Sequence, residues 1–384
     1  MPSPPASPSE RPGEAGSALW TVALGIALVA IAASPRRRRS ERDAEPEPER
    51  TARANGAHSH EGRTARWVAA TQEDRGRAAR DPTEIPAPGW KDIAFRVFQE
   101  FNKDRVLSVA AGVTFYTLLS LFPAVAALVT CYGLIADAGT INVHLASLRG
   151  VLPDSAIDIV GDQVKRIATK SGGTLGLTFF TTLLLSVWSA NAAMKAMFDA
   201  LNVVYEEQEK RNFFWLNLRS LTFTIGALLF VIIALSAIVV LPVVFNFVGL
   251  GDGAWALAML RWPALLIVIL GALTILYRYG PSREPARWRW VGVGGAIAGL
   301  LWVVASILFS WYVANFGSYN ETYGSLGAVI GFMTWIWISA TIVLLGGEIN
   351  AEIEHQTAHD STTGREKVLG ERQARMADTV GAAA

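Results

Sequence analysis

The segment Thr322 to Gly347 constrains the fold most, because none of its 26 residues is charged. A helix needs roughly 20 predominantly apolar residues to cross the hydrocarbon core of a bilayer. The segment exceeds that length, opens within the polar sequence NFGSYNETYGSLG and closes on the acidic sequence GGEINAEIE. The sequence therefore predicts a membrane-spanning helix here, with lipid as the solvent.

The composition of the whole chain supports the same class of protein. Hydrophobic side chains make up 51% of the 384 residues and charged side chains only 17%, which is too apolar for an ordinary soluble domain. A net charge of +1 argues against a nucleic-acid enzyme, which needs a basic face. Cys131 is the single cysteine, so no intramolecular disulfide can form. It lies in an apolar run, where a cysteine usually behaves as a small hydrophobic side chain. We therefore predict an all-α polytopic membrane protein.

Six charge-free runs follow residue 105, and they predict a six-helix transmembrane bundle within residues 89–356. The fourth run is short, but arginines at its ends can reach the headgroups, so it spans from about Leu257 to Tyr279. Pro123 and Pro242 predict helix kinks in the first and third runs, because proline removes a backbone hydrogen bond. The runs are Val106 to Ala136, Ser171 to Met194, Ser220 to Gly251, Trp262 to Tyr277, Trp290 to Asn320 and Thr322 to Gly347.

The distribution of lysine and arginine among the loops predicts the orientation of the bundle. Cytoplasmic loops carry an excess of these residues. One orientation places 12 basic residues inside and 5 outside, with both ends of the six-span core in the cytoplasm. We therefore expect a multi-pass protein of the bacterial plasma (inner) membrane in this orientation.

Two segments outside the runs have the spacing of amphipathic helices that lie on the membrane surface. The outer one, after Pro153, has Ile157, Val160, Val164 and Ile167 near helical spacing, and a solvated loop is the alternative. The inner one, residues 90–101, could instead pack against a cytoplasmic domain. Its apolar face has Trp90, Ile93, Ala94, Val97, Phe98 and Phe101, and its polar face has Lys91, Asp92, Arg96, Glu100, Lys103 and Asp104.

The N-terminal extension has a 16-residue apolar run at 18–33, followed by four arginines. A secretory signal carries its basic residues before the apolar run, so we predict an extra anchor helix at 18–33, with residues 1–17 outside. Cleavage after the Ala-Ile-Ala at 30–32 is the alternative. Residues 34–88 and 357–384 have few large apolar side chains, which predicts a disordered cytoplasmic linker and a disordered cytoplasmic tail.

Polar side chains at the inner ends of the second and sixth runs are candidates for a substrate path, because such groups in lipid face a bundle interior or a cavity. Asn191 and Lys195 are four residues apart, and Lys195 can pair with Asp199 one turn further along. The alternative is that these residues form the solvated end of a helix.

The carboxylates of Glu348 and Glu352, which flank Asn350, share a helix face. They could relay protons or hold a cation. The alternative, which we favour, is a structural clasp with arginines of the loop before the fifth run: Arg278, Arg283, Arg287 and Arg289. No metal site is expected at His355 and His359, because this segment runs into the predicted tail.

A polar elbow with Tyr319, Asn320 and Tyr323 joins the fifth and sixth runs, and we assign it to the outer half of the path. A tight connection with aromatic anchors at the membrane surface is the alternative. The pairs Gly295/Gly299 and Gly327/Gly331 have the spacing that lets helices approach closely, so we expect them to pack the bundle.

Four long motifs occur together between Gly89 and Gln356: AAGVTFYTLLSLFPAVAALVTCYGLIAD, WSANAAMKAMFDALNVVYEE, LYRYGPSREPARWRW and NFGSYNETYGSLGAVIGFMTWIWISATIVLLGGEINAEIEH. On these motifs the chain resembles the YihY/virulence factor BrkB family of bacterial inner-membrane proteins. The resemblance implies six membrane spans, and lipid or solute export has been suggested for members. It supplies no catalytic residue, and the former ribonuclease BN label of the family is a mistaken assignment.

We predict a transporter-like protein that moves a lipid or small amphiphile without ATP hydrolysis of its own. A non-transporting scaffold that organises envelope partners is the alternative. The sequence has no nucleophile beside a base, no metal motif and no phosphate-binding glycine loop, so we expect no enzyme activity and reject a ribonuclease. Membrane lipids are the expected partners, a homo-oligomer is compatible with the sequence, and neither a cofactor nor a nucleic acid is expected.

Overall fold

A computed structural model of the chain describes residues 72–133, 175–247, 254–316 and 325–383. Within these ranges every regular element is a helix, and strand pairing is limited to one isolated bridge between Ala286 and Thr362. The predicted anchor at 18–33, the predicted outer surface helix and the polar elbow between the last two runs lie outside the described residues. The all-helical part of the fold prediction is confirmed for the described ranges.

Six long helices in the described ranges follow the predicted charge-free runs. Four contain stretches long and apolar enough to cross a membrane: Val106–Val125, Phe213–Ala234, Trp288–Val313 and Val329–His355. A shorter apolar stretch, Leu266–Tyr279, belongs to a fifth helix. The chain is therefore a helical membrane protein, and the number of six crossings stays a prediction. The helices are α4 (Val106–Gly133), α7 (Leu175–Val204), α8 (Phe213–Phe247), α9 (Ala254–Tyr279), α10 (Trp288–Phe316) and α12 (Ser325–His355).

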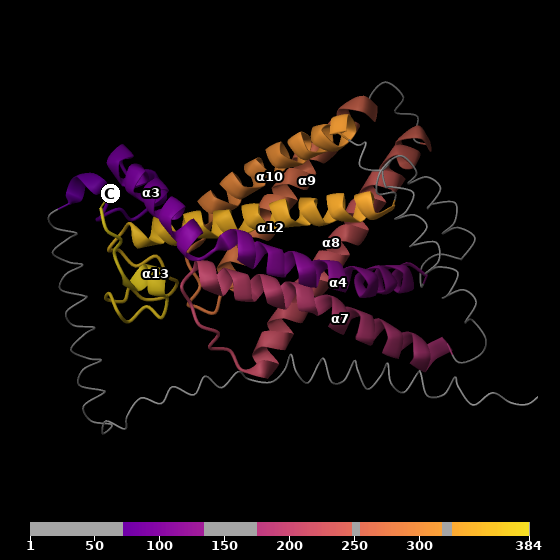
Figure 1. Ribbon diagram of the computed structural model, residues 1–384, viewed down its shortest axis with the longest axis horizontal. Coiled ribbons are helices and arrows are strands. Elements are labelled where there is room, and N and C mark those ends of the chain that lie inside the picture. The colour runs from indigo at the N-terminus through magenta and orange to yellow at the C-terminus, as the bar shows by residue number, and fades with distance from the viewer. Residues whose placement is uncertain (1–71, 134–174, 248–253, 317–324, 384) are drawn as a thin grey trace, which may run out of the picture. The chain divides into compact units, whose positions relative to one another are not determined.

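Helix α12 lies at the centre of the arrangement, between α4 on one side and α10 on the other (Figure 1). Helix α7 packs against α4, α9 packs against α10, and α8 runs obliquely to them while contacting α7 and α9. One end of this assembly is formed by the starts of α4, α8 and α10 and by the ends of α7, α9 and α12. We call this the clasp end, and the C-terminal residues gather there (Figure 1).

Glycine allows α10 to approach two neighbouring helices closely. A Cβ added at Gly294 would overlap the carbonyl oxygen of Gly346 on α12, and one at Gly346 would lie 2.6 Å from Ala298 Cβ. The predicted packing role of Gly295 and Gly299 is confirmed, since a Cβ at either would meet a side chain of α9. The prediction is wrong for Gly331, around which a Cβ would meet no atom within 4 Å.

The two predicted kink positions lie in continuous helix. Helix α4 runs through Pro123, and α8 runs through Pro242 with helical backbone on both sides. Helix α9 contains a further proline, Pro263, which was not predicted as a kink position. Bending at the two predicted prolines stays a prediction.

The inner amphipathic helix is present as α3 (Ala87–Lys103), but its buried face differs from the predicted one. Asp92 and Arg96, assigned to the polar surface, are buried, while Phe98 of the predicted apolar face is 70% exposed. The reason is electrostatic: Arg75 Nη1 lies 2.6 Å from Asp92 Oδ1, and Arg96 pairs with α12. Charges with a partner can be enclosed, whereas an aromatic side chain can stay exposed where lipid surrounds it.

The prediction of disorder is wrong for residues 72–88 and 357–383. The first segment forms two short 3-10 helices, η1 (Glu73–Arg75) and η2 (Pro82–Glu84), and packs on α3 and α10. The second segment contains α13 (Arg375–Asp378) and packs on α12. We call residues 357–383 the tail cap.

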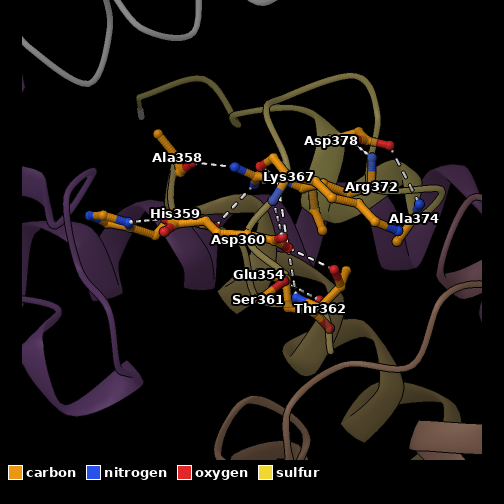
Figure 2. Close-up of polar contacts among 12 residues, drawn as sticks. Glu354, Ala358, His359, Asp360, Ser361, Thr362, Lys367, Arg372, Ala374 and Asp378 are labelled. Carbon is orange, nitrogen blue, oxygen red and sulfur yellow. Dashed lines mark hydrogen bonds and ion pairs between the residues drawn. The ribbon is translucent and has the colours of Figure 1, made fainter. Parts of the chain in front are cut away.

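Side-chain hydrogen bonds to the backbone hold the tail cap together, which is why its low apolar content misled the prediction. Arg372 donates to the carbonyl oxygens of Ala358 at 2.6 Å, His359 at 3.0 Å and Ala377 at 2.6 Å (Figure 2). Asp360 accepts from the backbone N–H of Lys367 at 2.8 Å. A composition rule counts apolar area and misses such a network.

Replacing Gly294 with alanine should lower stability by about 1 to 3 kcal/mol, because the added methyl group overpacks the α10–α12 contact. The matched control is Gly292→Ala on the same helix, where a Cβ meets no atom within 4 Å. Thermal unfolding of both variants in detergent micelles measures the difference. Equal midpoints for the two variants would show that this close approach does not exist.

Candidate functional site

The C-terminal part of α12 carries the strongest concentration of buried polar groups. Glu348, Asn350, Glu352 and Glu354 are each 1% exposed or less. These residues point in several directions around the helix, so the end of α12 is enclosed on all sides. Burying a carboxylate away from water is strongly unfavourable unless the carboxylate is paired. The partner of each of these carboxylates therefore shows what holds it in place.

Glu352 is paired with an arginine of α3. Arg96 Nε donates to Glu352 Oε2 at 2.5 Å, and both side chains are less than 10% exposed. The same guanidinium donates to Gln356 Oε1 at 2.7 Å and to the carbonyl oxygen of Ala382 at 2.9 Å. Arg96 therefore joins α3, α12 and the tail cap.

Glu354 is paired with an arginine of the loop between α9 and α10. Arg283 Nη2 donates to Glu354 Oε2 at 2.5 Å, and Ser361 Oγ of the tail cap donates to the same oxygen at 2.7 Å. The guanidinium lies over the ring of Tyr205, just after α7, at 5.0 Å from its centroid. This second pair joins α7, the α9–α10 loop, α12 and the tail cap.

The predicted clasp thus has other members than expected. Of the four arginines predicted to contribute, Arg283 contacts a carboxylate of α12, and that carboxylate is Glu354. Glu352 uses Arg96 instead. The other three arginines contact other groups: Arg278 donates to the Ala286 carbonyl oxygen, Arg287 to the Thr362 carbonyl oxygen, and Arg289 pairs with Asp81.

Asn350 connects α12 with α10. Its Nδ2 donates to the carbonyl oxygen of Val291 at 3.0 Å, and its Oδ1 accepts from the Gly294 N–H at 2.7 Å. Both amide groups are satisfied by one neighbouring helix. Asn350 therefore holds two helices together beside the close approach of Gly294 and Gly346.

Glu348 differs from the other carboxylates of α12. Its Oε2 is buried without a hydrogen-bond partner among the described residues. The charged groups that act on it most strongly are Asp104 and Glu352, which are both acidic. Burial raises the pKa of Asp104, which lies in the junction between α3 and α4, to about 6. Glu348 is the clearest candidate for a functional rather than a structural carboxylate, since unpaired intramembrane acids usually mark a path.

Asn191 and Lys195 occupy different environments, although they are one turn apart on α7. Asn191 is fully buried, accepts from Thr224 Oγ1 of α8 at 3.0 Å, and leaves its Nδ2 without a described partner. Lys195 Nζ lies 5.0 Å from the ring centroid of Trp188, which is exposed. Within the described ranges, Lys195 makes no ion pair with Asp199. Asn191 faces the space between α7 and α8, inside the bundle, and Lys195 reaches towards the surface of the protein.

Three further candidates, Tyr319, Asn320 and Tyr323, lie outside the described residues. Within the described ranges, no group of three or more His, Cys, Asp or Glu side chains is arranged to hold a metal ion. Sequence reasoning missed the structural role of Arg96. The spacing of the sequence could have indicated this role. The buried residues of α3 lie at i, i+3, i+4 and i+7, which is one helix face: Gly89, Asp92, Ile93 and Arg96.

Burial is asymmetric along α8, α10 and α12, whereas α4 and α7 keep buried side chains further along, at Ser120, Ala127 and Ser186. At the clasp end, α8, α10 and α12 each have buried side chains, for example Ser220, Ala298 and Leu344. Further along, none of the described side chains is buried at 225–234, 300–315 or 327–335. Each stretch exceeds two helical turns and so points in every direction. In these stretches no helix face packs as tightly against a neighbour as at the clasp end.

These observations define a helical membrane protein whose described helices are tied together at one end by buried ion pairs. The chain belongs to the virulence factor BrkB family, whose model matches residues 97–369. The resemblance inferred from the four motifs is confirmed.

The relatives include a protein of Bacillus subtilis (strain 168), named YfkH and described as ribonuclease-like. It is 31% identical over 266 residues, covering 66% of this chain and 92% of the relative. A UPF0761 membrane protein of Rhodospirillum centenum is 28% identical over 295 residues, covering 73% of this chain but only 61% of the relative. The chain therefore spans about 60% of the length of several UPF0761 relatives. No solved structure matches the chain significantly.

Replacing Arg96 with glutamine should destabilise the protein by about 3 to 5 kcal/mol, because Glu352 is left buried without its arginine partner. Adding Glu352→Gln to this variant should recover much of the loss, since no unpaired charge remains. Arg365→Gln, at an exposed position of the tail cap, is the control. Thermal unfolding of the four proteins in detergent measures the effect, and a double variant no more stable than Arg96→Gln would contradict the pairing.

Proposed function

We propose that this protein is a carrier in the bacterial plasma membrane that moves a lipid or small amphiphile without hydrolysing ATP. The observation that carries the proposal is the asymmetry of burial in α8, α10 and α12, which have buried side chains near the clasp end and none in the described stretches 225–234, 300–315 and 327–335. A carrier that alternates between two states closes one end while the other is accessible. A scaffold has no need for one loosely packed half.

In this proposal the clasp is the closed gate. Opening it requires that Arg96 and Arg283 leave Glu352 and Glu354, or that the helices move together with these pairs. Asn350 holds two helices together, so it belongs to the gate rather than to the path.

The inner half of the path is formed by Asn191 and Glu348, each with a buried atom that lacks a described partner. Lys195, near the surface of α7, would meet the substrate at its entry from the lipid. The outer half of the path remains assigned to Tyr319, Asn320 and Tyr323. No catalytic role is proposed for any of these residues, and ribonuclease activity is not part of the proposal.

The proposed orientation places the clasp end and both ends of the six-span core in the cytoplasm. The excess of lysine and arginine near this end supports it. Exposed aromatic side chains, including Phe98, Phe214 and Trp288, lie at the same end, as expected for residues at the level of the lipid headgroups.

A reporter enzyme that is active only in the periplasm, fused to the C-terminus, should stay inactive in cells. A second fusion of a reporter active only in the cytoplasm should give signal at the same site. Periplasmic activity of the first fusion would overturn the orientation.

Liposomes containing the purified protein should move headgroup-labelled lipid faster than empty liposomes. Glu348→Gln should slow this movement about tenfold or more, because the variant removes the ionisable carboxyl group from the proposed path. Lys195→Ala should slow it as well. The matched control is Glu371→Gln, at an exposed position, which should move lipid at the parent rate. Parent rates equal to those of empty liposomes for every lipid class would reject the carrier and leave the scaffold.

A further inference from the structure

An arginine in the candidate membrane span of α8 is exposed and has no hydrogen-bond or ion-pair partner among the described residues. Arg219 lies six residues after Phe213, the start of the candidate span Phe213–Ala234. That distance corresponds to about 9 Å along the helix axis. Its side chain is exposed and makes no hydrogen bond or ion pair within the described ranges. An arginine at this depth is unfavourable unless it meets a counter-charge or reaches the headgroups.

The surrounding protein supplies more positive than negative charge. Arg211, which precedes α8, acts on Arg219 electrostatically, as does Glu209. Arg211 is already committed, with Nη2 at 2.7 Å from Glu209 Oε2 and 2.9 Å from the Gly280 carbonyl oxygen. The one carboxylate of this group is therefore neutralised by Arg211. Arg219 is left without an anion of its own.

Aromatic side chains flank this positive charge. Trp215, one helical turn before Arg219, is 58% exposed, and Trp288 at the start of α10 is 52% exposed. Tyr279, which acts on Arg219 electrostatically, packs edge-on against Trp288 with 6.2 Å between ring centroids. Exposed tryptophans, and tyrosines that are partly exposed as Tyr279 is, favour the headgroup level of a bilayer.

The surface continues along α8 as an apolar face. Leu218, Ile225 and Leu229 are all exposed on the same span. A ligand for Arg219 would therefore contact a charged group at one end and hydrocarbon-binding side chains along the rest. An inorganic anion fits only the first part of this surface.

We propose that Arg219, with Trp215, Tyr279 and Trp288, forms a binding site for the phosphate group of an anionic phospholipid. The guanidinium of Arg219 donates to two phosphate oxygens, a geometry that matches its planar fork. The indole rings contact the glycerol region, and the acyl chains lie along the apolar face of α8. The site is separate from the proposed path, and it holds whether or not the protein transports lipid.

The test uses the purified full-length protein in detergent, with bound phosphatidylglycerol measured by native mass spectrometry. Arg219→Gln should raise the apparent Kd for phosphatidylglycerol about tenfold, the size of one charge-assisted contact. Arg219→Lys should lose less affinity for phosphatidylglycerol, because lysine keeps the positive charge but lacks the planar pair of donors of a guanidinium group. Arg365→Gln, which removes an exposed arginine from the tail cap, should bind as the parent does. Phosphatidylcholine, with no net charge, should bind the parent at least about tenfold more weakly.

Three results would each overturn the proposal. The first is an unchanged Kd for Arg219→Gln, and the second is an equal loss for Arg219→Gln and Arg365→Gln, which would indicate a general effect of net charge. The third is displacement of bound phosphatidylglycerol by inorganic phosphate at equal concentration, which would indicate a simple anion site. Unfolding midpoints measured without added lipid verify that the variants are folded. If Arg219→Gln does not fold, Arg219→Lys decides, and an unchanged Kd in that variant rejects the proposed fork contact.

Discussion

The enclosure of carboxylates at the end of α12 is the constraint on which the clasp end depends. A desolvated carboxylate needs a partner of opposite charge, and Glu352 and Glu354 each obtain one from a distant part of the chain. Arg96 comes from the helix before the first long run, and Arg283 from the loop before α10. Two ion pairs therefore bring together segments that hydrophobic burial alone would not position in lipid, where apolar surfaces do not drive helices together.

Glu348 lies in the same enclosure but lacks such a partner, and the difference gives the site its functional interest. The paired carboxylates hold the closed end, and Glu348 and Asn191 retain unsatisfied buried atoms near it. Beyond this end α8, α10 and α12 have described stretches with no buried side chain. A rigid end joined to a loosely packed half suits a protein whose helices move relative to one another about one end, which is the basis of the carrier proposed above.

The long helices could be predicted from the sequence because each needs only an uninterrupted apolar run, and the family could be predicted from four long motifs. The partners of the charged groups could not. The acidic residues of α12 and the arginines are visible in the sequence, but the choice of Arg96 for Glu352 depends on how α3 packs. The tail cap escaped prediction for a related reason, since Arg372 stabilises it through backbone carbonyl groups that any sequence possesses.

The position of the tail cap also bears on the order in which the protein assembles. Gly381 donates its N–H to the His355 carbonyl oxygen at 2.8 Å, and Ala382 accepts from Arg96. These residues follow α12 in the chain, so they leave the ribosome after the described long helices. Until the tail cap has been synthesised, it cannot cover the end of α12. The clasp end is therefore completed only after residues 357–383 have docked on α12 and α3.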